Sequence, residues 1–95
     1  MNFFQYHTEI EDAFIHRRGK GLILTPKEWA LIERWKEMGI PLQVVLGGIE
    51  RVFARHEALP NPSGINSLAY CQREVEAQFA EWRKQSPDEQ ENFKG

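Results

Sequence analysis

Three histidines and a single cysteine are the side chains of this 95-residue chain that are best suited to metal binding or catalysis. His7 and Glu11 are four residues apart, as are Asp12 and His16, so each pair shares one face of a helix. The two pairs point to different sides, whereas a metal ion needs convergent ligands. His56 falls near a predicted helix end, where an imidazole interacts with the helix dipole. We therefore expect edge or capping histidines, with no metal site and no cofactor.

Nucleophilic catalysis would need Cys71 or a serine beside a base. Cys71 lies in the middle of a predicted apolar stripe, where burial opposes the reactive thiolate. The serines occupy loop or helix-cap positions, and the chain has no glycine-rich phosphate motif. These observations predict a protein without enzymatic activity.

The densest positive charge, His16-Arg17-Arg18-Gly19-Lys20, lies at the end of the first predicted helix. A nucleic-acid-binding patch would use this cluster together with two later arginines, namely Arg17, Arg18, Lys20, Arg51 and Arg55. Arginines at a helix end also interact favourably with its dipole, and the chain carries a net charge of -2. Arg17 projects near the core side, so we expect it to lie over aromatic rings. An accessory role in replication or transcription is therefore the alternative function.

Gly47 and Gly48 are the most unusual local feature, because each glycine inside a helix costs about 1 kcal/mol relative to alanine. Helical spacing places Val44, Gly47 and Arg51 opposite the apolar stripe of their helix, with Arg55 on the same side and Gly48 at its flank. The glycines allow either a close approach of another helix within the chain or a shallow groove for a partner helix. The arginines favour the groove. The leading hypothesis is therefore a non-catalytic interaction module that binds another protein or a second copy of itself, through Val44, Gly47, Gly48, Arg51 and Arg55.

Glycines and prolines divide the chain into four predicted helices, at about 3–18, 26–38, 41–57 and 66–85, with an extended connector at 20–24. Thr25-Pro26-Lys27-Glu28 is a capping box, with proline at the first helical position. Gly39-Ile40-Pro41 predicts a tight corner between the second and third helices. The sequence thus predicts an all-α fold, a compact array of four helices.

Each predicted helix carries an apolar stripe that we expect to be buried. The stripe residues are Phe3, Ile10 and Phe14; Leu31, Ile32, Trp35 and Met38; Leu42, Val45, Leu46, Ile49, Val52 and Phe53; and Leu68, Cys71, Val75, Phe79 and Trp82. His7 is expected at the margin of the first stripe. Phe4, Ile15 and Tyr70 lie off the stripes, and we expect them to cover further sides of the core.

Residues 1–85 are long enough for one domain, and the polar, acidic residues 86–95 are expected to be a disordered tail. No apolar run approaches the roughly 18 residues of a membrane span. One cysteine excludes an internal disulfide. The simplest location is therefore the cytoplasm, with no membrane partner.

The stretches FFQYHTEIEDAFIHRRGK, LTPKEWALIERWKEMGIPLQVVLGGI and INSLAYC resemble a family of uncharacterised bacterial helical proteins. The resemblance covers most of residues 3–75 and implies a helical fold without implying a function. The architecture is also loosely similar to the DnaD-type helical domain of bacterial replication-initiation proteins. Tyr70 and Trp82 are spaced more widely here than in that family, and its basic tail is missing.

Overall fold

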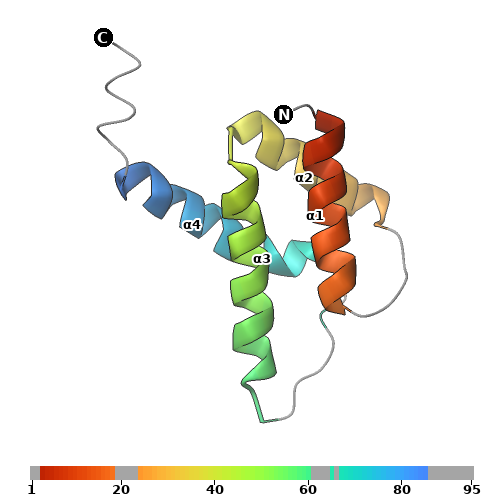
Figure 1. The fold of residues 1–95 in the computed structure, drawn as a ribbon, viewed down its shortest axis with the longest axis vertical. Coiled ribbons are helices and arrows are strands. Elements are labelled where there is room, and N and C mark those ends of the chain that lie inside the picture. The colour runs from red at the N-terminus through yellow and green to blue at the C-terminus, as the bar shows by residue number, and fades with distance from the viewer. Residues whose placement is uncertain (1–2, 19–23, 61–64, 66, 86–95) are drawn as a thin grey trace.

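The computed structural model describes residues 3–18, 24–60, 65 and 67–85 (Figure 1). Within these ranges the chain forms helices and turns and no strand, which confirms the all-α prediction. The elements are α1 (Phe3–Arg18), α2 (Pro26–Met38), α3 (Leu42–Glu57), the short 3-10 helix η1 (Leu68–Cys71) and α4 (Gln72–Gln85).

Both ends of α2 form as the sequence predicts. The backbone N–H of Thr25 donates to Glu28 Oε1 at 2.8 Å, and the N–H of Glu28 donates back to Thr25 Oγ1, which completes the capping box. At the other end Gly39 takes a left-handed backbone with φ of 82°, and the N–H of Ile40 donates to the carbonyl of Trp35. This Schellman motif turns the chain sharply into α3.

The third and fourth helices differ in detail from the prediction. Pro41 is the N-cap of α3 in an extended conformation, so that helix begins at Leu42. The Ser67 hydroxyl accepts the N–H of Ala69, and the fourth predicted helix starts as the tighter turn η1 before α4. A tight first turn is common where a side chain caps a helix.

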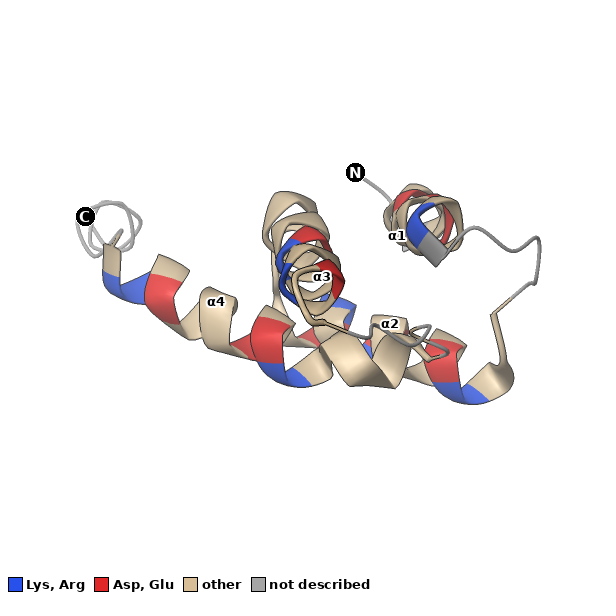
Figure 2. Ribbon diagram, turned by 90° about the horizontal axis from the view of Figure 1, so that it is seen from below, with Lys and Arg blue, Asp and Glu red and all other residues tan. Residues whose placement is uncertain are grey.

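The helices form two layers (Figures 1 and 2). α1 and α3 lie side by side and run in the same direction, while α2 and α4 cross beneath them. A hydrogen bond joins the start of α1 to the turn before α3, because the Tyr6 hydroxyl donates to the carbonyl of Ile40 at 2.9 Å. α3 is the central element, since it packs on α1 along one side and on α4 along another.

The core lies between the two layers. The burial of three sites differs from what the apolar stripes predict. Val44 is buried, although it lies opposite the predicted stripe, because α4 covers that side of α3; Gly48, at the flank, is buried by the same contact. Met38 is 38% exposed, because the turn at Gly39 brings Ile40 into the core in its place. His7 is buried and stacked on Trp29, not marginal.

Two residues expected to cover the core are instead exposed. Phe4 of α1 is 75% exposed and Tyr70 of η1 is 60% exposed. Ile15 is half-buried. The connector at 20–23 and the predicted tail at 86–95 lie outside the described residues. None of the described helices is both long and apolar enough to cross a membrane.

Candidate functional site

Gly48 lies at a close approach of α3 and α4. A Cβ atom at Gly48 would lie 2.7 Å from Val75 Cγ2 and 2.9 Å from Val75 Cα. Non-bonded carbon atoms do not approach so closely, so only glycine fits at this position without a shift of the helices. The structure thus supplies the contact that the intrachain interpretation of Gly48 requires.

Gly47 has a different environment from its neighbour. It is exposed, and a Cβ atom there would lie 3.4 Å from Gln78 Oε1, at the end of a flexible side chain. Its place in a helix is therefore not explained by a close backbone contact. Gln78 and the nearby Val44 both line a surface groove on this side of the molecule.

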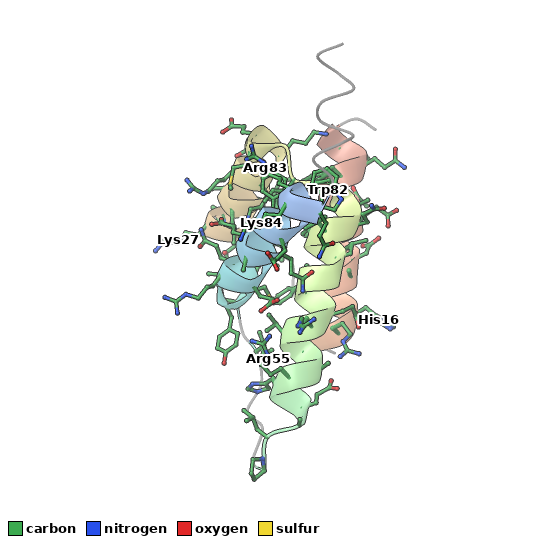
Figure 3. All side chains as sticks on the ribbon, turned by 90° about the vertical axis from the view of Figure 1, so that its left-hand side faces the viewer. His16, Lys27, Arg55, Trp82, Arg83 and Lys84 are labelled. Carbon is green, nitrogen blue, oxygen red and sulfur yellow. The ribbon has the colours of Figure 1, made fainter. Side chains whose placement is uncertain are left out.

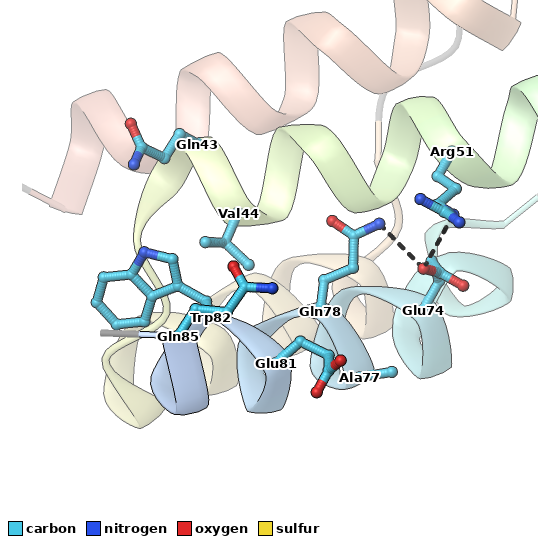
Figure 4. Close-up of a pocket in the computed structure, with 9 residues that line it drawn as sticks. All are labelled: Gln43, Val44, Arg51, Glu74, Ala77, Gln78, Glu81, Trp82 and Gln85. Atoms are coloured by element: carbon cyan, nitrogen blue, oxygen red, sulfur yellow. Dashed lines mark hydrogen bonds and ion pairs between the residues drawn. The ribbon is translucent and has the colours of Figure 1, made fainter. Parts of the chain in front are cut away.

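This α3–α4 groove has a volume of about 500 Å³ (Figure 4). Its lining combines one indole, two aliphatic side chains, three amides and three charged side chains: Gln43, Val44, Arg51, Glu74, Ala77, Gln78, Glu81, Trp82 and Gln85. Trp82 is half-buried and stacks on Phe79, with ring centroids 6.0 Å apart. The predicted partner-binding residues Val44 and Arg51 therefore line one groove, while Gly48 lies beneath it.

Ion pairs hold one end of the α3–α4 groove. The Glu74 carboxylate accepts hydrogen bonds from Gln78 Nε2 and Arg55 at 3.0 Å each, and Arg51 Nε lies 3.8 Å away. The hydrogen bond from Gln78, together with the two arginines, holds the pKa of Glu74 below its ordinary value. An ionised carboxylate therefore orients both arginines of the predicted site.

Arg17 lies on the opposite side of α3. Its guanidinium pairs with Glu57 at 3.3 Å and Glu50 at 3.6 Å, and it lies 5.4 Å from the ring centroid of Phe53. The prediction that Arg17 covers an aromatic ring is confirmed. Since Arg51 and Arg55 face α4, the three described arginines of the proposed basic patch lie on two sides of α3.

Lys20 and the side chain of Arg18, the other members of that basic patch, lie outside the described residues. The three described arginines all carry carboxylate partners, which reduces their attraction for phosphate. The prediction of a nucleic-acid surface therefore rests on positions that the structure pairs internally or does not describe.

The residues considered for metal or thiol chemistry are dispersed. Among the described residues, no three His, Cys, Asp or Glu side chains converge as metal ligands. Burial lowers the pKa of His7, and His56 meets the ring of Tyr70 edge-on. Cys71 is fully buried, and burial raises its thiol pKa to about 12, so the thiol stays protonated.

Sequence reasoning missed the second role of Glu28. Beyond the capping box, its other carboxylate oxygen accepts the backbone N–H of Leu68 at 2.7 Å. The side chain is almost fully buried and so joins the start of α2 to the start of η1. No local signal could reveal this bond, because its two residues are forty positions apart.

Sequence reasoning also missed that Trp82 lines a groove. The narrow apolar stripe of the fourth helix, flanked by Gln72 and Gln78, was the available signal. Figure 2 shows that α4 continues past α3. An indole in the last turn of α4 can therefore be only partly covered by α3.

These features define the class of the molecule as a two-layer, all-helical array with a polar groove between α3 and α4. A protein-family model described as "Uncharacterised protein" matches residues 5–91, and the chain belongs to this family. No curated protein and no solved structure matches the chain.

Proposed function

We propose that this protein is a non-catalytic interaction module that receives a helix of another protein in its α3–α4 groove. The observation that carries the proposal is the groove itself, which places the half-exposed indole of Trp82 beside Val44 and a row of amides. Tryptophan and arginine are enriched where protein partners bind tightly. In Figure 3, Trp82 lies toward one end of α4, and Arg55 lies further along α3, next to the groove lining and not part of it.

The polar lining supports a partner that docks reversibly. Gln43, Gln78 and Gln85 offer hydrogen-bond donors and acceptors on both walls of the groove, around a small apolar centre. Surfaces of reversible complexes have this composition, whereas obligate interfaces are more apolar. A second copy of the chain, paired across a two-fold axis, is one such partner.

Two observations weigh against the other functions considered. The high pKa of the buried Cys71 thiol disfavours a thiol enzyme. The carboxylate partners of Arg17, Arg51 and Arg55 weaken the nucleic-acid alternative, whose signature would be a steep loss of affinity with salt. The cytoplasmic location and the bacterial origin of the family stay predictions.

The experiment compares partner capture by the wild type, a groove variant and a matched control. The groove variant carries Gln43→Arg and Glu81→Arg, both at exposed lining positions, and the control carries Glu33→Arg on the exposed side of α2. Circular dichroism first verifies that all three chains fold. Crosslinking in lysate of the source organism, followed by mass spectrometry, identifies what each chain binds, and light scattering measures self-association.

We expect wild type and control to capture the same protein, or to form the same dimer, and the groove variant to lose it. A groove variant that captures the same partner proteins as the wild type, or forms the same dimer, would overturn the proposal. A strict monomer at high concentration would exclude self-association alone.

A further inference from the structure

A second hollow lies where the end of α3 meets the start of η1 and α4. It has a volume of about 370 Å³ and is lined by Val52, Arg55, His56, Leu59, Tyr70, Arg73 and Glu74. We refer to it as the Tyr70 hollow. It shares Glu74 with the α3–α4 groove, and Figure 3 shows Arg55 well away from Trp82 along the direction of α3.

The apolar side chains of this hollow are unusually open to solvent. Leu59 is 50% exposed and Tyr70 is 60% exposed, and both line the same depression above the buried Val52. The ring of His56 supports Tyr70 edge-on, with centroids 6.0 Å apart. Single exposed apolar residues are ordinary, but two that face one hollow offer a place for a third apolar side chain.

The charge around the hollow is positive, in contrast to the chain as a whole. Arg55 and Arg73 line it, and Arg51 shares the Glu74 carboxylate with Arg55. The two arginines and the glutamate that line the hollow sum to +1, whereas the whole chain carries -2. Within the described part of the chain, Arg73 enters no ion pair, so its guanidinium is available to a ligand carboxylate.

We propose that the Tyr70 hollow binds an acidic peptide segment of a partner protein. An aromatic or aliphatic side chain of that segment packs between Leu59 and Tyr70, and a carboxylate beside it pairs with Arg73. Charge complementarity selects the peptide and sets its orientation, while the apolar contact provides the anchor. The proposal does not depend on occupation of the α3–α4 groove, since the two surfaces have different lining residues apart from Glu74.

Amide NMR titration of the full ¹⁵N-labelled chain tests this assignment. The probe is a synthetic ten-residue peptide with four glutamates around one phenylalanine. Two control peptides replace the phenylalanine by serine or the glutamates by lysine. We expect the acidic, phenylalanine-containing peptide to shift the amides of Leu59, Tyr70 and Arg73, and each control peptide to lose most of that shift.

Single substitutions at exposed positions then test the two contacts separately. Tyr70→Ala and Arg73→Glu should each weaken binding of the probe about tenfold, which corresponds to ~1.4 kcal/mol. The matched controls are Phe4→Ala, which removes an exposed aromatic ring on α1, and Lys84→Glu, which reverses an exposed charge on α4. Both controls, and the Gln43→Arg, Glu81→Arg groove variant, should bind as the wild type does.

Three results would overturn the proposal. One is the absence of localised shifts at about 2 mM peptide, a concentration that detects contacts with a Kd of ~1 mM. Another is equal binding by the wild type, Tyr70→Ala and Arg73→Glu chains. The third is a single-stranded oligouridylate that shifts the same amides at lower concentration than the peptide, which would assign the hollow to RNA bases stacked on Tyr70.

Discussion

Adjacent glycines on α3 are expected to respond in opposite directions to the same substitution. Gly48→Ala inserts a methyl group 2.7 Å from Val75 Cγ2 and 2.9 Å from its backbone Cα, so the two helices must separate. Overpacking of this kind costs about 1–3 kcal/mol, and the higher helix propensity of alanine returns about 0.5–1 kcal/mol. We expect a net loss of up to about 2.5 kcal/mol.

Gly47→Ala makes the matched comparison. Its methyl group meets only the flexible end of Gln78, at 3.4 Å. The helix propensity gain then dominates, so we expect stabilisation by about 0.5–1 kcal/mol. The two variants should thus differ by about 2 kcal/mol, a large share of the ~5–14 kcal/mol that stabilises a chain of this length.

Urea denaturation followed by circular dichroism measures both free energies of unfolding, and an unchanged slope verifies two-state behaviour. A double variant with Val75→Ala isolates the side-chain part of the contact and should recover only part of the Gly48→Ala loss, because the Val75 backbone is also close. If Gly48→Ala were as neutral or stabilising as Gly47→Ala, the close approach of α3 and α4 would be refuted.

Three further predictions concern buried or paired side chains. Glu28→Ala removes the acceptor of the Thr25 and Leu68 N–H groups and should cost about 2–4 kcal/mol in urea unfolding, whereas the exposed Glu33→Ala should cost less than ~0.5 kcal/mol. The pKa of Glu74 is lower in the folded state than in the unfolded state. The ionised Glu74 therefore adds to the free energy of unfolding above the unfolded pKa, and this contribution is lost as pH falls through the folded pKa. The stability difference between wild type and Glu74→Gln should therefore shrink between pH 7 and 3, and a constant difference would contradict the pairing. Cys71, with its pKa raised to about 12, should react with a thiol reagent at pH 8 only after urea unfolds the chain; rapid labelling of the native protein would show that the thiol is accessible.

The helix boundaries could be predicted because their signals are local. The capping box at Thr25 and Glu28 and the left-handed turn at Gly39 each involve residues that are neighbours in the sequence. The position of Arg17 over Phe53 was also accessible, since helical spacing directs that side chain toward the core. The same reasoning could not place Met38, because the turn that follows it decides whether it is covered.

The candidate sites were less accessible than the helices. Val44 and Arg51 were selected from the sequence and line the α3–α4 groove, but Trp82 and Gln78 on the opposite wall were not selected. The Tyr70 hollow was not predicted as a site, because its walls come from the end of α3 and the start of α4. A groove or hollow between two helices exists only once their crossing is known.

The amino-acid sequence by itself determined the four helical segments, both caps of α2 and most of the buried stripes, because these depend on interactions within a few residues. The tertiary structure alone decided that α4 covers the Val44 and Gly48 side of α3, and that Glu28 joins α2 to η1. It also decided that Arg17, which belongs to α1, lies on the side of α3 opposite to Arg51. These outcomes follow from packing between segments far apart in the chain, where the burial of a face depends on which other face lies against it.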